Sequence, residues 1–170
     1  MNLLETINAN DFVPEDYAVR NVVRCVILSD DRNKVLLFGH YLPGGGVEDG
    51  ETDADAIARE CMEEVGAKVE VIKALGQIVT YRDFLRKQYV VNGYLCKLAG
   101  EHGQPTTTHA DEQKIPVQWV SVATAVSELE EKIEALSKQF PPDQESDVAQ
   151  RKIYNRKISL RFLQEAIQDK

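Results

Sequence analysis

Apolar and polar residues follow strand-like patterns in the first hundred positions. Residues 19–28 (VRNVVRCVIL) are rich in β-branched side chains, and residues 34–38 (KVLLF) follow them after a polar turn. Two such runs joined by a turn predict a hairpin. Residues 68–81 and 87–98 again carry the Val, Ile and Tyr content of strands. The pattern therefore predicts two pairs of strands.

A loop and a helix are expected between these two strand pairs. Three consecutive glycines end the segment 42–46 (LPGGG), and glycine permits backbone angles that other residues avoid. Thr52 is a favourable N-cap, and Asp55 three residues later completes an arrangement like a capping box. Gly66 suits the position just beyond a helix. A helix is therefore predicted between Thr52 and Gly66.

The second half of the chain predicts one short strand and two helices. A polar loop over 99–115 leads to the apolar segment 117–120, and residues 123–138 have a helical pattern. Pro141 and Pro142 should end that helix, because a proline pair cannot continue it. Residues 148–167 place apolar side chains at four-residue steps, so this last helix should bury one face.

Composition and charge narrow the class of protein. With 170 residues, 43% of them hydrophobic and 28% charged, the chain suits one ordinary globular α/β domain with an appendage. The net charge of −8 disfavours nucleic acid, which is held mainly by clustered Lys and Arg. No segment approaches the roughly 18 apolar residues of a membrane span, and the first residues do not resemble a signal peptide. A cytoplasmic location is expected.

The cysteines predict no further chemistry. Cys25, Cys61 and Cys96 are odd in number, widely spaced and surrounded by apolar residues. This is typical of reduced core residues and not of a disulfide framework or a zinc site. Catalysis by a thiol is therefore disfavoured.

Three glutamates gather on one side of the predicted helix. At about 3.6 residues per turn, Glu60 and Glu64 lie one above the other and Glu63 lies beside them. Apolar residues occupy the neighbouring arc, so the helix should hold these acids near the margin of its buried stripe. Partly desolvated carboxylates need a cation, and hard oxygen ligands suit Mg²⁺. The alternative is a plain solvated acidic face.

Glu51 and Arg59 favour the functional interpretation over the solvated face. Glu51 precedes the helix and Arg59 lies in its second turn, so an ion pair between them would hold the glycine loop against the helix. An ordinary surface pair, contributing under about 1 kcal/mol, is the alternative.

These residues together match a known pattern. Gly45, Glu51, Arg59, Glu60 and Gly66, with Glu63 and Glu64, fit the Nudix box, G-x5-E-x7-R-E-U-x-E-E-x-G-U, where U is bulky and aliphatic. Seven such matches arise by chance on the order of once in 10⁸ to 10⁹ start positions. The chain resembles the Nudix hydrolase (MutT-like) family. It departs at the two U positions occupied by Cys61 and Ala67, which affects packing more than chemistry.

The resemblance implies a fold and a division of the chain. It implies an α/β/α sandwich around a mixed central sheet, with an extra C-terminal helix beyond the minimal pattern. Residues 1–18 would be an N-terminal extension and residues 19–139 the Nudix domain. Residues 140–170 would be a linker and a helix that packs on the domain or on a partner, which leaves a homodimer open.

The resemblance also implies a metal-dependent mechanism. Glu60, Glu63 and Glu64 would bind Mg²⁺, with Mn²⁺ as an alternative, helped by the carbonyl of Gly44 or Gly45. Glu51 and Arg59 would orient the site. In such enzymes the base that activates water is either a glutamate of the box or an acid on a later loop. The later-loop candidates are Glu112 and Asp111, which a plain solvated loop would explain equally well.

Two functions follow from this resemblance. The first is hydrolysis of a phosphoanhydride bond in a nucleoside diphosphate linked to another moiety, as in a nucleotide sugar, a dinucleoside polyphosphate or a nucleoside triphosphate. The second is a Nudix-like regulatory module that senses a nucleotide sugar without cleaving it. Such modules often lose glutamates of the box, and this chain keeps all of them, which favours the enzyme.

Overall fold

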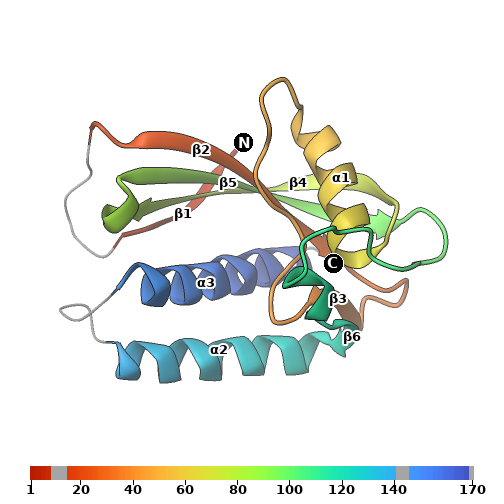
Figure 1. Cartoon of the computed structure of the whole chain (residues 1–170). Helices are drawn as coiled ribbons and strands as arrows, with labels where there is room; N and C mark the ends of the chain where they lie inside the picture. Colours follow the sequence, from red (N-terminus) through yellow and green to blue (C-terminus); the bar gives the residue numbers. More distant parts are fainter. Residues whose placement is uncertain (9–14, 141–145, 169–170) are drawn as a thin grey trace.

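The computed structural model describes residues 1–8, 15–140 and 146–168. In this part of the chain, three strands precede the first α-helix and three follow it, and two further α-helices come last (Figure 1). Two short 3₁₀ turns, Asp83–Leu85 and Glu112–Lys114, lie in the connections between the later strands. The main elements in chain order are β1 (Leu3–Ile7), β2 (Ala18–Ile27), β3 (Lys34–Phe38), α1 (Asp53–Val65), β4 (Val69–Arg82), β5 (Lys87–Leu98), β6 (Val117–Ser121), α2 (Val122–Gln139) and α3 (Asp147–Gln168).

The strands form a mixed sheet and a separate two-stranded ribbon. The sheet has the order β1-β4-β5-β2, with β4 and β5 antiparallel and the two outer strands parallel to their neighbours. The ribbon pairs β3 with β6 in antiparallel register. The pairing of β4 with β5 confirms the second predicted strand pair. The sequence pattern did not predict β1.

The predicted hairpin between β2 and β3 is wrong. Between the segment of β2 and that of β3, the structure has only an isolated antiparallel β-bridge, from Leu28 to Val35. The whole of β2 pairs with β5, and β3 pairs with β6, where Leu36 faces Trp119. A local turn brings two strands near each other, but the partners of buried strands are chosen by long-range packing, which propensity does not report.

Buried side chains of β2 point alternately to the two faces of the sheet, and the core therefore has two layers. Val23, Cys25 and Ile27 pack with α1, whereas Val22 and Val26 pack on the opposite side with α3. Successive side chains of a strand point to opposite faces, so β2 is covered on both sides. This arrangement confirms the predicted α/β/α class. The three cysteines are free and buried, as expected.

Helix α3 packs directly on the mixed sheet, and α2 packs on the side of α3 that faces away from the sheet (Figure 1). Gly93 of β5 permits this close packing, because a Cβ there would come within 2.3 Å of the Phe162 ring. The expected helix stop at Pro141 and Pro142 lies outside the described residues. In the part of the chain that the structure covers, none of the helices has the length and apolar character needed to cross a bilayer.

Helix α1 has the ends that the sequence predicted. The Thr52 hydroxyl accepts the N–H of Asp55, and the Asp55 carboxylate accepts the N–H of Thr52, so both halves of the capping box are formed. Gly66 adopts φ +63°, and its N–H bonds to a carbonyl of the last turn. These two ends place the glutamates of α1 in a defined position along the sheet.

Candidate active site

The glycine loop runs along the free edge of β2. The N–H of Val23 donates to the carbonyl of Gly45, and the N–H of Cys25 donates to the carbonyl of Pro43, both at 2.9 Å. Gly44 adopts φ +133°, and a Cβ there would lie 2.3 Å from the carbonyl oxygen of Val23. Only glycine fits this conformation and this approach. The sheet therefore fixes the loop in place.

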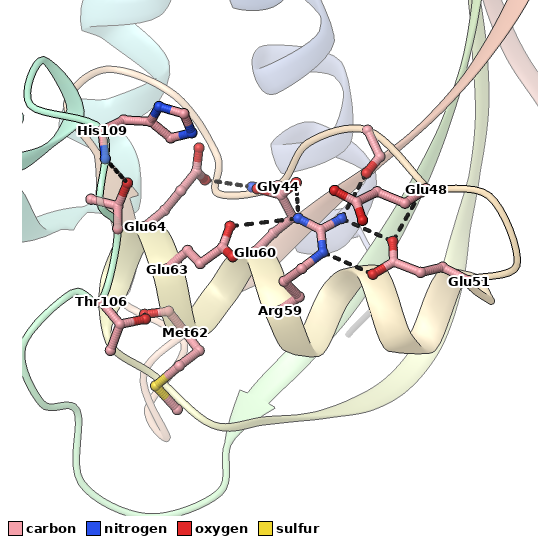
Figure 2. Close-up of polar contacts among 12 residues, drawn as sticks. Gly44, Glu48, Glu51, Arg59, Glu60, Met62, Glu63, Glu64, Thr106 and His109 are labelled. Carbon is pink, nitrogen blue, oxygen red and sulfur yellow. Dashed lines mark hydrogen bonds and ion pairs between the residues drawn. The ribbon is translucent and has the colours of Figure 1, made fainter.

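Two glutamates of α1 lie against this loop. The carboxylate of Glu64 accepts the N–H of Gly44 at 2.8 Å (Figure 2). The carboxylate of Glu60 packs on Gly45 so closely that a Cβ there would be 2.2 Å from Glu60 Oε1. Helix and loop thus hold two carboxylates beside the same stretch of backbone.

Arg59 ties the loop to the helix. Its guanidinium binds both oxygens of Glu51 at 2.8 and 2.9 Å, and a third bond at 2.9 Å reaches the carbonyl of Gly46. The same group donates to Glu60 at 2.8 Å and lies 3.5 Å from Glu63 (Figure 2). A planar guanidinium suits this two-pronged contact, which orients both partners. Arg59 therefore sets the position of the acids around it.

The electrostatics separate the acids into two kinds. Bonds from Arg59 hold the pKa of Glu51 at about 2, so Glu51 is an ionised anchor. Burial raises the pKa of Glu60, although Arg59 opposes this. Burial also raises the pKa of Glu64 to about 7, while Arg24 and the N–H of Gly44 act in the opposite direction. Glu60 and Glu64 are thus carboxylates whose negative charge is poorly compensated.

Arg24 is a site residue that the sequence pattern did not single out. It projects from β2, and its guanidinium donates to the carbonyl of Gly44. Its charge lowers the pKa of both Glu60 and Glu64. The signal was available, since Arg24 interrupts a run of apolar strand residues where a charge is unusual.

The polar loop after β5 closes the site on the other side. The N–H groups of Thr106 and Thr107 donate to the carbonyls of Met62 and Glu63 at the end of α1. Figure 2 shows Thr106 beside Met62. The Thr107 hydroxyl then donates to Glu112 at 2.5 Å, and the charge of Glu112 contributes to the raised pKa of Glu64. The structure thus brings Glu112 toward the glutamates of α1.

Asp111, the other candidate of this loop, lies in solvent. Its side chain is fully exposed and lies 3.8 Å from Lys114. Of the two acids considered on the loop, the structure therefore places only Glu112 near the acids of α1.

Comparison with known proteins agrees with this geometry. The model of the NUDIX domain matches residues 19–144. The chain belongs to the Nudix family. This match confirms the predicted family and the predicted enzyme class, the pyrophosphohydrolases.

Solved structures with the Nudix fold resemble the chain at low sequence identity. A NUDIX hydrolase from Nitrosomonas europaea has TM-score 0.55 and 19% identity, covering 65% of this chain and 77% of that one. A UDP-X diphosphatase has TM-score 0.55 and 22% identity, covering 89% of this chain. This Nudix chain spans 64% of the diphosphatase, slightly less than two thirds. MutT from Burkholderia pseudomallei has TM-score 0.50 and 22% identity, covering 62% and 85% of the two chains. These likenesses show the fold.

Nudix hydrolases generally use a divalent metal, and the donors of this site fit one. Among residues 1–8, 15–140 and 146–168, no cluster of three or more His, Cys, Asp or Glu side chains is already arranged to hold a metal ion. Instead, Arg59 and Arg24 lie against the glutamates. The donors are nonetheless hard oxygens, and Glu60 lies in a cradle that a Cβ at Gly45 would fill. Two carboxylates with raised pKa values at one loop are suited to a cation.

Proposed function

We propose that this Nudix protein is a Mg²⁺-dependent hydrolase that cleaves a phosphoanhydride bond in a nucleoside diphosphate linked to another moiety. The observation that carries the proposal is the pair Glu60 and Glu64, held by one helix against the glycine loop with insufficient positive charge to balance them. Glu60 shares the single guanidinium of Arg59 with Glu51, Glu64 accepts a backbone N–H, and burial still raises the pKa of both Glu60 and Glu64. A cation that also binds an anionic substrate accounts for this arrangement.

Glu60, Glu63 and Glu64 would hold Mg²⁺, or Mn²⁺ in its place, together with the carbonyl of Gly44. Gly45 is the alternative, since the carbonyl of Gly45 accepts the N–H of Val23 and that of Gly44 accepts the guanidinium of Arg24, which leaves each one lone pair for the cation. When bound, the cation neutralises the charge of the phosphates, polarises the phosphorus and makes a water more acidic.

The remaining steps belong to the side chains of the protein. Arg59 and Glu51 keep Glu60 in position through the bonds described above, so the carboxylate does not have to reorganise during the reaction. In this proposal a carboxylate takes the proton of the attacking water, and the two candidates are Glu64 of the box and Glu112 of the later loop. The pH dependence of kcat in a Glu112→Gln variant separates these two assignments.

Three substrate classes satisfy this chemistry, namely nucleotide sugars, dinucleoside polyphosphates and nucleoside triphosphates. The likeness to a UDP-X diphosphatase covers 89% of this chain and therefore includes elements outside the box, which supports a nucleotide substrate. A sensor of nucleotide sugars is the second candidate function. It is disfavoured because every glutamate of the box is kept, with Glu51, Glu60 and Glu63 held by Arg59 and Glu64 held by the N–H of Gly44.

The test is a screen for phosphate release with nucleotides of all three classes in Mg²⁺ or Mn²⁺, coupling the products to a phosphatase. Glu64→Gln should lose most turnover, since a neutral amide is a poor ligand for Mg²⁺. Glu70→Gln is a matched control, because Glu70 is exposed and pairs with Lys97 at the surface, away from α1. Turnover of no nucleotide by the wild type would favour the sensor. Wild-type turnover in Glu64→Gln would overturn the metal assignment.

A further inference from the structure

A cavity of about 190 Å³ opens beside the glycine loop, on the face of the mixed sheet that α3 covers. Strand β2 contributes Arg20 and Arg24, β4 contributes Arg82, and α3 contributes Asn155. The rest of the lining is glycine, aliphatic side chains and one tyrosine, with no acid among them. In a chain of net charge −8, three arginines around one small cavity are unexpected.

Arg82 is buried in this cavity, and none of the acids in the described part of the chain forms an ion pair with it. It is 6% exposed, its Nη2 donates to Asn155 Oδ1 at 2.9 Å, and its guanidinium lies 4.4 Å from the ring centre of Tyr89. Among the residues that the structure describes, its Nε has no hydrogen-bond partner. A buried cation without a bonded carboxylate is costly unless an anion joins it.

The charges around Arg82 agree with this deficit of anions. Burial lowers the pKa of Arg82, and the like charges of Arg24 and Arg151 lower it further. The charges of Tyr89 and Asp147 act in the opposite direction. The cavity therefore has a positive charge that its own residues leave uncompensated.

The arginines also connect the cavity to the proposed catalytic site. Arg24 lies between them, since its guanidinium donates to the carbonyl of Gly44 and acts on Glu60 and Glu64. Arg20 is exposed at the mouth of the cavity, and a Cβ at Gly46 would lie 2.3 Å from its guanidinium. Gly45, which lines the cavity, is also the residue on which the Glu60 carboxylate packs, so the cavity and the proposed catalytic site share the glycine loop.

We propose that this cavity binds a phosphate group of the substrate beyond the two that flank the scissile bond. On this basis, and resting on the proposed function, the enzyme prefers a nucleoside triphosphate or longer polyphosphate to a nucleotide sugar. A diphosphate joined to a sugar has about two negative charges, whereas a free triphosphate has about four near neutral pH. Three arginines beyond the glutamates match the larger charge.

The lining argues against the other parts of a nucleotide as occupants. Arg82 covers one face of the Tyr89 ring, so a base cannot stack on that face. A sugar offers hydroxyl groups that need acceptors as well as donors, whereas a guanidinium only donates and Asn155 Oδ1 is already engaged. Guanidinium groups match phosphate oxygens in both charge and hydrogen bonding.

The first experiment measures anion binding without metal or nucleotide. Inorganic tripolyphosphate is titrated calorimetrically into the full chain in EDTA, where the glutamates alone would repel it. Arg82→Gln and Arg20→Gln should each weaken binding by about tenfold, and Arg82→Lys should restore most of it. Arg20 is exposed, so its variant is expected to fold even if Arg82→Gln does not. Arg86→Gln, which removes an exposed arginine outside the cavity, should leave binding within about twofold.

The second experiment compares kcat/KM for UTP with UDP-glucose, and for ATP with ADP-ribose, in the same variants. Loss of Arg20 or Arg82 should reduce the triphosphate value about tenfold more than the nucleotide-sugar value. Equal losses on both substrates, or tripolyphosphate binding unaffected by the variants, would overturn the phosphate site while leaving hydrolysis in place. Arginine-dependent binding in a protein that hydrolyses no nucleotide would overturn the proposed function and support the phosphate site.

Discussion

Glu64→Gln is expected to stabilise the metal-free protein at alkaline pH even though it removes the proposed catalysis. Burial raises the pKa of Glu64 to about 7, and the nearby acids Glu60 and Glu112 add to the effect. A carboxyl with a raised pKa is more easily protonated in the folded state than in the unfolded chain. Its ionisation therefore opposes folding whenever no cation is bound.

The size of the effect follows from this pKa. A rise from the ordinary value of 4.5 to about 7 corresponds to at most about 3 kcal/mol, since a tenfold difference in proton affinity is about 1.4 kcal/mol. The side chain is partly exposed, so solvent screening reduces the expected gain to about 1–3 kcal/mol. The penalty is absent below pH 4.5, where both states are protonated. It grows as the pH rises toward 7 and is complete above that.

Urea unfolding in EDTA at a pH of about 5 and of about 8 measures this penalty. Glu64→Gln should be more stable than the wild type by about 1–3 kcal/mol at the higher pH and by much less at the lower one. Added Mg²⁺ should stabilise the wild type but not the variant, because only the wild type binds it well. Glu70→Gln should stay within about 0.5 kcal/mol of the wild type at both values. A stability difference that does not change with pH would refute the electrostatic argument.

Three further predictions concern the scaffold of the site. Arg59→Lys should lower kcat/KM by about 10–100-fold, because lysine cannot bind both oxygens of Glu51 at once; an unchanged value in steady-state kinetics would show the clamp to be dispensable. Gly45→Ala should lower activity by about 100-fold with an unchanged circular dichroism spectrum, because its Cβ displaces Glu60. Thr52→Ala should reduce the free energy of unfolding by about 1 kcal/mol through loss of the N-cap, and thermal denaturation checks this.

By itself, the sequence determined the features that depend on neighbours a few residues apart. The capping box at Thr52 and the left-handed Gly66 are set by hydrogen bonds within one turn, so α1 could be predicted almost to the residue. The same periodicity placed Glu60 and Glu64 on one side of that helix. Most strands were predictable in extent because their β-branched content is local, and the Nudix box sufficed for the family.

Only the tertiary structure decided which elements meet. Strand β2 pairs with β5 instead of β3, and β1 joins the sheet edge, because pairing maximises burial over long distances in sequence. The same long-range packing brings Glu112 toward Glu64 and assembles the cavity from Arg24, Arg82 and Asn155 on three separate elements. A charged side chain shows its role only when its neighbours in space are known, since burial and partners together determine its free energy.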